Sequence, residues 1–547
     1  MTASLPATSG RWLFGPAPDL LLGCGGLCAL IFLFSVWAGP VIRGHQADLL
    51  FPLLVLAISY PHYGATLLRV YENRKDRRGY ALFAVHLTLV LAAAFVAALY
   101  IPLVGILLVT VFLTWSPWHY TGQNYGLALL FLRRRGVEID DTTKRWIYTS
   151  FIVSFLLTAV VMHEAAGANV DNLLSIYRAD AIRFQPLGIP LGASRLLVLG
   201  LGAVYVLAIG VAARRLLKRS TAADLLPAAA LAGTQALWFV IPFALRHAQT
   251  TVGVEPLDWD FRLHYFVWIA LGHAIQYLWI TSYYAKRSGK WNGLSRYYTK
   301  VSVSGIALWT LPVVLFSTSF MGGPSFEAGL GILVASVVNI HHFVLDGAIW
   351  KLRNHRIGNV LIRDRGEAPN AEYEGSRPRF GKRTLVWSLA ALGASGAVAA
   401  FWLEEVSYPG AMKQRDLVAA GQSLDALGVL GRDSAARRSH LGVLFSRRGE
   451  DAAALQQLET SVALRPHPQA LTTIGQLANR KSDWRKALSA FESALSLAPD
   501  QPDILRLAAA AAHRVGDPEK RQQYLQRAGD LQRGDGSRET NASRKAP

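Results

Sequence analysis

Long apolar runs recur along most of this chain of 547 residues, and they restrict its fold more than any other feature of the sequence. Each run is long enough for an α-helix to cross a hydrocarbon core about 30 Å thick. Strands of a membrane barrel would be about ten residues long and would alternate in polarity, so the runs do not fit that class. They predict eleven transmembrane helices, at 19–38, 49–69, 81–100, 103–131, 146–163, 195–213, 225–245, 263–284, 301–320, 327–350 and 384–402.

The composition leads to the same class of protein. Charged residues make up 17% of the chain, whereas soluble proteins carry about 25%. This excludes a soluble enzyme, a disordered chain and a secreted disulfide scaffold, and we expect Cys24 and Cys28 to be small packing residues. A net charge of +19 would fit a nucleic-acid partner. The cations lie between the apolar runs, however, and we expect no nucleic acid.

The distribution of cations predicts the orientation in the membrane. The loops after even-numbered spans hold 27 Lys and Arg, and those after odd-numbered spans hold 5. Loops that remain in the cytoplasm carry such an excess. We therefore expect a cytoplasmic N-terminal segment at 1–18 and a membrane domain at 19–402. Because eleven is odd, the chain after residue 402 is expected on the periplasmic side of a bacterial inner membrane.

A repeat of 33 to 34 residues follows the last apolar run. The segment 468–501 carries Leu471, Ile474, Gly475, Ala478, Trp484, Ala487, Phe491, Ala494 and Pro499. Similar patterns stand one repeat earlier and one repeat later. The segment resembles the tetratricopeptide (TPR) pattern, with small residues where paired helices touch and a proline that ends the second helix.

This resemblance implies a helical solenoid with a concave surface that docks a protein partner. A plain stack of helices that only stabilises the chain is the alternative interpretation. We expect a linker and capping helix at 403–434, repeats at 435–530 and a disordered tail at 531–547, which is rich in small and polar residues. The predicted fold class is therefore all-α, a polytopic helix bundle followed by a TPR-like solenoid.

Polar residues that could ligate a metal recur within the predicted spans. Ionisable groups in hydrocarbon cost a few kcal/mol each and are normally paired or functional. Measured from the cytoplasmic ends of the spans, these groups fall in a layer about 10–15 Å thick. Five helices contribute to this layer, which holds His62, His86, His119, His273, His341, His342 and Asp346.

The local sequences add detail. His62 follows Pro61, which can open a helix. His119 lies in an aromatic and amide-rich stretch, and His342 and Asp346 share one helix face at i and i+4. His341 points about 100° away from His342, so one of the pair is expected to be a ligand and the other a supporting donor.

Several neutral imidazoles and a carboxylate suit a first-row transition metal, above all non-haem iron, as one ion or two. We expect amides to orient the rings, and aromatic side chains to line an apolar channel to the metal. These candidate residues are Trp118, Tyr120, Gln123, Asn124 and Gln276. Proton or ion translocation and purely structural polar packing are the alternative roles for the cluster. His45, His163, His247 and His264 are expected near the outer surface.

The arrangement is similar in kind to histidine-rich integral-membrane iron oxygenases, the desaturase and hydroxylase group and the membrane carotenoid-cleaving dioxygenases. The resemblance implies iron near the cytoplasmic face and oxidation of a lipid that enters from the bilayer. It assigns a ligand role to His62, His119, His273, His342 and Asp346, with His86 and His341 in reserve. The HxxxH and HxxHH boxes of the desaturases are absent.

We therefore expect a membrane-embedded, metal-dependent oxidoreductase acting on a lipid or isoprenoid, with a repeat domain that docks a protein. A haem-binding membrane protein is one alternative. A transporter or envelope-assembly scaffold with a histidine proton relay is another. The sequence holds no P-loop, dinucleotide fingerprint, GxSxG elbow or CxxC pair.

Overall fold

The structure, a computed structural model, is helical in every regular element that it describes. It describes residues 10–31, 33, 50, 52–71, 79–165, 182–241, 261–287, 293–350, 355–362 and 381–543. The chain forms two compact units. The bundle unit comprises Met1–Pro312 and Gly331–Val398, and the helix-pair unit comprises Val313–Leu330 and Ala399–Pro547.

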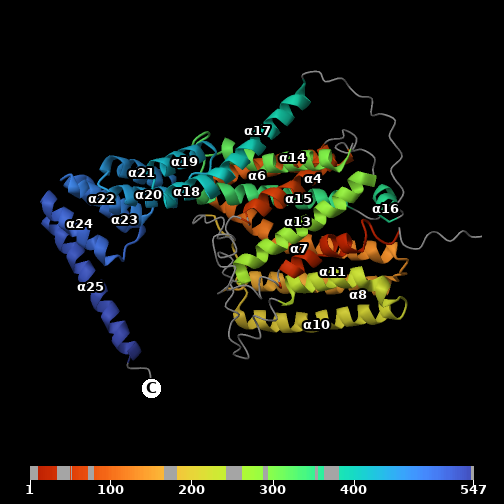
Figure 1. Ribbon diagram of the computed structural model, residues 1–547. Coiled ribbons are helices and arrows are strands. Elements are labelled where there is room, and N and C mark those ends of the chain that lie inside the picture. Colours follow the sequence, from red (N-terminus) through yellow and green to blue (C-terminus); the bar gives the residue numbers. More distant parts are fainter. Residues whose placement is uncertain are drawn as a thin grey trace, which may run out of the picture. The chain divides into compact units, whose positions relative to one another are not determined.

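Long helices build the bundle unit and lie side by side, roughly parallel or antiparallel (Figure 1). The short elements of this unit are α1 (Pro16–Pro18), η1 (Asp19–Gly23) and α16 (His355–Leu361). The long ones are η2–α4 (Val55–Ser59, Tyr60–Tyr71), η3–α6 (Leu82–Leu87, Thr88–Tyr100), α7 (Pro102–Arg134), α8 (Asp141–Met162), α10 (Leu191–Leu217), α11 (Ala222–Phe239), α13 (Phe261–Arg287), α14 (Leu294–Leu315), α15 (Gly331–Ile349) and α17 (Lys382–Trp402).

Eight helices of the described chain are long and apolar enough to cross a membrane. They overlap the predicted spans two to six and nine to eleven, although Leu294–Leu315 begins before the predicted residue 301 and Lys382–Lys413 continues well past the predicted end at residue 402. The helices α11 and α13 occupy the positions of spans seven and eight. The first predicted span lies partly outside the described residues, so the total of eleven stays a prediction. Cys24 and Cys28 are free and buried, as expected of packing residues.

Two glycines allow α4 to approach α14 closely. A Cβ at Gly64 would collide with the carbonyl oxygen of Val301, and a Cβ at Gly305 would collide with that of Tyr60. Small residues permit this kind of backbone contact between membrane helices. The crossing fixes the position of α4, which carries two polar residues of the candidate site, His62 and Thr66.

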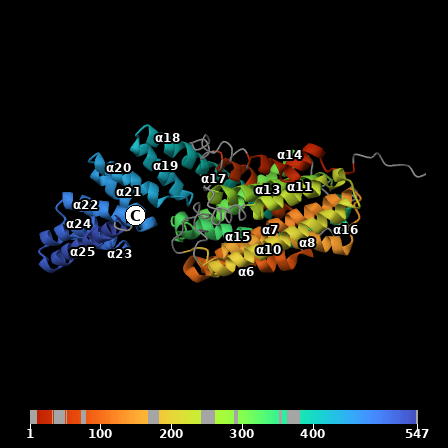
Figure 2. The same cartoon turned by 90° about the horizontal axis from the view of Figure 1, so that it is seen from below.

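Pairs of shorter helices make up the helix-pair unit (Figure 2). These are η6–α18 (Leu403–Ser407, Tyr408–Lys413), α19 (Leu417–Val429), α20 (Ala435–Arg447), α21 (Asp451–Leu464), α22 (Pro468–Arg480), α23 (Trp484–Leu497), α24 (Pro502–Val515) and α25 (Pro518–Ser543). The described helix α25 continues beyond Asp530, into the segment that the sequence predicts to be a disordered tail.

The turns within these pairs repeat at a regular spacing. A residue with positive φ ends the first helix of each pair, at Arg415, Gly449, Ser482 and Gly516. Successive turns are therefore 34, 33 and 34 residues apart. The repeating series begins one helix pair earlier in the chain than the predicted repeats, which start at residue 435. At equivalent positions, Gly442 faces Leu458 and Gly475 faces Phe491, with no room for a Cβ.

The segment Val313–Leu330, which includes the π-helical turn η5 (Phe326–Leu330), belongs to the same unit. Ser319 Oγ donates a hydrogen bond to the carbonyl oxygen of Gly428 at 2.9 Å. The Arg432 guanidinium lies 4.2 Å from the centre of the Phe326 ring and pairs with Glu404 at 2.8 Å. The loop between α14 and α15 is thus packed against the first helix pair.

Candidate metal centre

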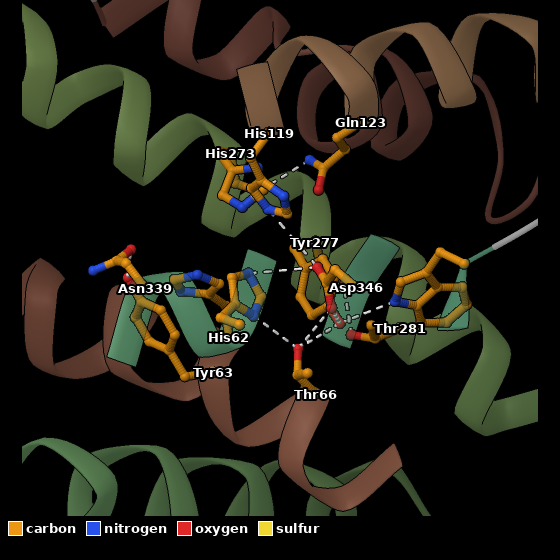
Figure 3. A network of polar contacts seen from close by, with 12 residues as sticks. His62, Tyr63, Thr66, His119, Gln123, His273, Tyr277, Thr281, Asn339 and Asp346 are labelled. Atoms are coloured by element: carbon orange, nitrogen blue, oxygen red, sulfur yellow. Dashed lines mark hydrogen bonds and ion pairs between the residues drawn. The ribbon is translucent and has the colours of Figure 1, made fainter. Parts of the chain in front are cut away.

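Four histidines and one aspartate from four helices meet inside the bundle unit (Figure 3). His62 comes from α4, His119 from α7, His273 from α13, and His342 and Asp346 from α15. The ligand atoms of His62, His273 and His342 lie within 4.8 Å of one another, and so do those of His119, His342 and Asp346. These are the five residues to which the sequence assigns the main ligand role.

The imidazole rings pack closely around a common centre. The ring of His342 lies 4.8 Å from that of His62 and 5.1 Å from that of His119, centroid to centroid. The ring of His273 lies 4.8 Å from that of His119 and 5.5 Å from that of His62. Because most of these pairs are steeply inclined to each other, several rings can direct a nitrogen to one point.

Several nitrogens of this cluster have no hydrogen-bond partner among the described residues. They are Nε2 of His119, both ring nitrogens of His273, and Nε2 of His342. An unpaired buried polar atom costs about 1–3 kcal/mol, and such atoms are rare in native proteins. Four of them in one place are unusual, and a metal ion is a partner that several imidazoles can share.

The two oxygens of Asp346 face different surroundings. Oδ1 accepts hydrogen bonds from the hydroxyl of Tyr277 at 2.7 Å and from that of Thr66 at 2.9 Å. Oδ2 lies 3.4 Å from Nε2 of His342 and 3.8 Å from Nε2 of His119. One oxygen is therefore held by the protein, and the other is directed into the group of histidines.

Thr66 also contacts His342 and Tyr277. Its hydroxyl lies 3.0 Å from Nδ1 of His342 and 2.7 Å from the hydroxyl of Tyr277. A neutral His342 that donates from Nδ1 to Thr66 carries its lone pair on Nε2. That lone pair faces Oδ2 of Asp346. Two such electron-pair donors repel each other unless a proton or a metal ion lies between them.

The position of His62 follows from an irregularity in its helix. The π-helical turn η2 ends at Ser59, two residues before Pro61, which has no backbone N–H to donate. His62 donates from Nδ1 to the carbonyl oxygen of Ser59 in a short hydrogen bond. A histidine that ligates a metal commonly donates its other nitrogen to a backbone carbonyl in this manner.

The two reserve histidines lie elsewhere. His86 is exposed on η3 and is not part of the cluster. His341 points away from His342, as its neighbouring position on a helix predicts, and its Nε2 lies 2.9 Å from Thr88 Oγ1 and 3.1 Å from Tyr71 OH. The ring of His341 also stacks on that of Tyr71.

Aromatic rings enclose the imidazoles. Phe343 stacks on His119 at 4.4 Å, Tyr63 packs on His62 at 3.8 Å, and Tyr120 packs on His273 at 4.5 Å, centroid to centroid. Of the two aromatic residues predicted to line the site, Tyr120 is thus buried against a cluster histidine. Trp118 is 39% exposed and packs on Phe155 of α8.

The predicted amides contact one another and the backbone. Gln123 donates from Nε2 to Oε1 of Gln276 at 3.0 Å and to the carbonyl oxygen of His273 at 3.3 Å. Asn124 donates to Gln235 at 2.9 Å, in a separate network between α7, α8 and α11. Among the described residues, the cluster rings contact the hydroxyl of Thr66 and the carbonyl oxygen of Ser59, and none of the predicted side-chain amides hydrogen-bonds to a ring nitrogen.

Sequence reasoning missed two residues that hold the site, Thr66 and Tyr277. Each stands four positions after a candidate ligand, on the same helix face as His62 or His273. A search for hydroxyl groups at i+4 from each histidine would have found both. Trp350 supports this pair, because its indole N–H donates to the hydroxyl of Tyr277 at 3.0 Å.

The remaining predicted histidines are not part of the cluster or cannot be placed. His163 is buried at the end of α8, where Nδ1 accepts from the backbone N–H of Leu187 at 3.1 Å and Nε2 lies 3.0 Å from Thr114 Oγ1. These contacts give it a structural role. His45, His247 and the side chain of His264 lie outside the described residues.

The donor set is four imidazoles and one carboxylate, and it suits iron, zinc, copper or manganese. Such a site can bind a small molecule beside the protein ligands and act as a Lewis acid or a redox centre. Comparison with known proteins adds no assignment, because no protein-family model matches the chain and no curated protein shows significant similarity to it.

Proposed function

We propose that this chain is an integral-membrane metalloenzyme, an oxidoreductase that uses non-haem iron to oxidise a lipid or an isoprenoid. The observation that carries the proposal is the group of unpaired imidazole nitrogens around Oδ2 of Asp346. A purely structural polar cluster would pair these atoms with one another or with the backbone, since the cost of leaving them unpaired is large.

The chain's own residues define how a metal would be held. His62, His119, His273, His342 and Asp346 supply the ligand atoms, as one site or as two sites that share His342. Iron bound there would supply the activation of dioxygen. Thr66 and Tyr277 hold the carboxylate of Asp346 in place, and the aromatic rings around the imidazoles exclude water.

The same geometry favours non-haem iron over haem. A haem iron takes two axial protein ligands, one on each face of a wide planar ring. Here the His342 ring has those of His62, His119 and His273 all within 6.1 Å, centroid to centroid. Such a convergence matches direct coordination of a small ion.

We propose further that the helix-pair unit is a TPR-like solenoid that docks a protein partner. The support is the spacing of the left-handed residues and the tight glycine contacts within the pairs. Stacked helix pairs of this length form extended concave surfaces, which bind other chains.

We place the N-terminus in the cytoplasm of a bacterial cell and the helix-pair unit on the periplasmic side of the inner membrane. The charge of the loops supports this orientation. The loop between α14 and α15 follows the ninth predicted span and is thereby assigned to the periplasm. This loop shares a compact unit with residues 399–547, so both parts are assigned to one side.

Metal analysis of the purified protein tests the central claim. We expect one or two equivalents of iron per chain in the wild type and in His86→Ala, whose histidine lies outside the cluster. We expect His273→Ala to lose most of the metal, because it removes a buried ligand from the centre. Stoichiometric zinc in place of iron would overturn the redox assignment, and wild-type protein without bound metal would overturn the metal centre.

The reaction is tested by comparing lipid extracts of cells that express the wild type or His119→Ala. We expect an oxidised lipid or isoprenoid only with the wild type. A haem absorption band near 400 nm in purified protein would identify haem as the cofactor and contradict the non-haem proposal.

A further inference from the structure

One ligand of the candidate centre is more accessible than the other four. The His119 side chain is 10% exposed, whereas those of His342 and Asp346 are 2% and 6% exposed. His62 and His273 are 3% and 1% exposed. The approach to the centre is therefore most open at α7, the helix that carries His119.

A groove lies between α7 and α8, and its lining includes Trp118, the residue that precedes His119. Trp118, Thr121, Gly122 and Tyr125 line it from α7, and Tyr148, Phe151 and Ile152 line it from α8. On each helix these residues form a single stripe at helical spacing, and seven residues along a helix cover about 10 Å. The rings of Tyr125 and Tyr148 meet at 5.3 Å at one end of the groove.

Gly122 joins the groove to the face that carries His119. It stands three positions after His119 and four after Trp118, so it borders both faces of α7. A Cβ at Gly122 would meet no atom within 4 Å. The absence of a side chain here leaves open space on the part of α7 that lies one turn after His119.

We propose that this groove binds one hydrocarbon chain of a membrane lipid and directs it to His119. The inference rests on the proposed function, whose substrate class it narrows to molecules with a long apolar chain. Nothing charged lines the groove, which complements an uncharged chain. Both helices are of membrane-spanning length and composition, and both present exposed apolar side chains such as Val111 and Leu156. The neighbouring medium at the groove is therefore hydrocarbon.

Photo-crosslinking in liposomes tests the proposal. The full-length protein is reconstituted with a phospholipid that carries a diazirine in its acyl chain or, separately, with a diazirine-bearing isoprenyl alcohol, and the labelled peptides are mapped. We expect labelling of 118–125 and 148–152 to exceed that of the outward face of α10 at least fivefold. The probe that labels more strongly identifies an acyl or an isoprenoid chain.

Gly122→Leu should reduce labelling of the groove about tenfold, because the new side chain fills the open space. Gly126→Leu is the matched control on the same helix, since its Cβ also has free space and Gly126 does not line the groove. Ile152→Trp blocks the groove from α8 and serves as a second variant if Gly122→Leu does not fold. Labelling that equals that of α10, or that survives both blocking variants, would overturn the proposal.

The metal content of the same samples separates this proposal from the proposed function. Loss of groove labelling with metal retained is the result expected for Gly122→Leu. Selective labelling of the groove in a protein that binds no metal would support the lipid site and refute the metal centre.

Discussion

At the scale of single residues, Thr66 supports two members of the candidate centre at once, Asp346 and His342. Its hydroxyl donates to Oδ1 of Asp346 and lies 3.0 Å from Nδ1 of His342, so one side chain contacts both a carboxylate and an imidazole of the cluster. Supporting groups of this kind change metal affinity about 10–100-fold when they are removed. The role of Thr66 can therefore be measured without altering any ligand.

We expect Thr66→Val, which keeps the shape but removes the hydroxyl, to weaken metal binding about 10–100-fold in a competition titration with a chelator. Thr158→Val is the matched control, because that hydroxyl bonds only to the backbone of its own helix, at 3.4 Å from the carbonyl oxygen of Ser154. Equal metal affinity in the two variants would show that Thr66 does not support the centre.

The histidines that cluster were predictable from the sequence, because a histidine in hydrocarbon is costly and its depth can be counted from the charged end of its span. His62, His119, His273 and His342 were found in this way. The supporting residues Thr66 and Tyr277 were not, since a hydroxyl is common in membrane helices. Only the packing of α4, α13 and α15 brings these hydroxyls to Asp346.

At the scale of elements, the crossing of α4 and α14 decides where His62 lies. Gly64→Ala inserts a methyl group against the backbone of α14, and such overpacking costs about 1–3 kcal/mol or more. We expect a lower melting temperature in detergent and a reduced metal content. Gly233→Ala in α11, where a Cβ has free space, should be neutral or stabilising. Unchanged stability and metal content in Gly64→Ala would contradict the tight crossing.

A second element-scale prediction concerns α22. His467 caps this helix by accepting the backbone N–H of Ala470, and only a neutral ring can accept there. Burial lowers the pKa of His467, and the nearby Arg465 lowers it further. In the unfolded chain the pKa is about 6.5. The contribution of the neutral cap to stability is therefore complete above pH 6.5 and declines as the pH falls towards the folded-state pKa.

We expect the amides of 468–480 to be less protected from hydrogen exchange at pH 5.5 than at pH 7.5, after correction for intrinsic rates. The loss should correspond to about 1 kcal/mol, which is typical of a helix cap. In His467→Asn, a cap that does not titrate, the protection should be independent of pH. The same loss in this variant would assign the effect to another group.

Most element positions could be predicted from the sequence, because length and apolarity alone identify a spanning helix. The first helix pair of the C-terminal unit could not be recognised as part of the periodic series. Its turn has Arg415 at the position of positive φ where the next pair has Gly449. The backbone conformation therefore repeats, but the amino-acid type does not, and the sequence alone does not reveal the repeat.

At the scale of the whole molecule, the proposed orientation can be tested with single cysteines, because Cys24 and Cys28 are both buried. Ser489→Cys places an exposed thiol on α23, and Lys218→Cys places one after α10. In intact bacterial cells, a maleimide that cannot cross the inner membrane should label the first and spare the second. The opposite pattern would show that the topology is inverted. If both cysteines were labelled only after lysis, both positions would lie in the cytoplasm.

The division of the chain into two units has a consequence for how the proposed metalloenzyme could be regulated. Leu330 ends a segment of the helix-pair unit, and the next residue begins α15, which carries His342 and Asp346. Under the proposed function, a partner whose binding shifts α15 would change the metal affinity, and by thermodynamic linkage the metal would change the partner's affinity by the same factor. The proposed docking unit would then bind the metal-loaded and the metal-free protein with different affinities.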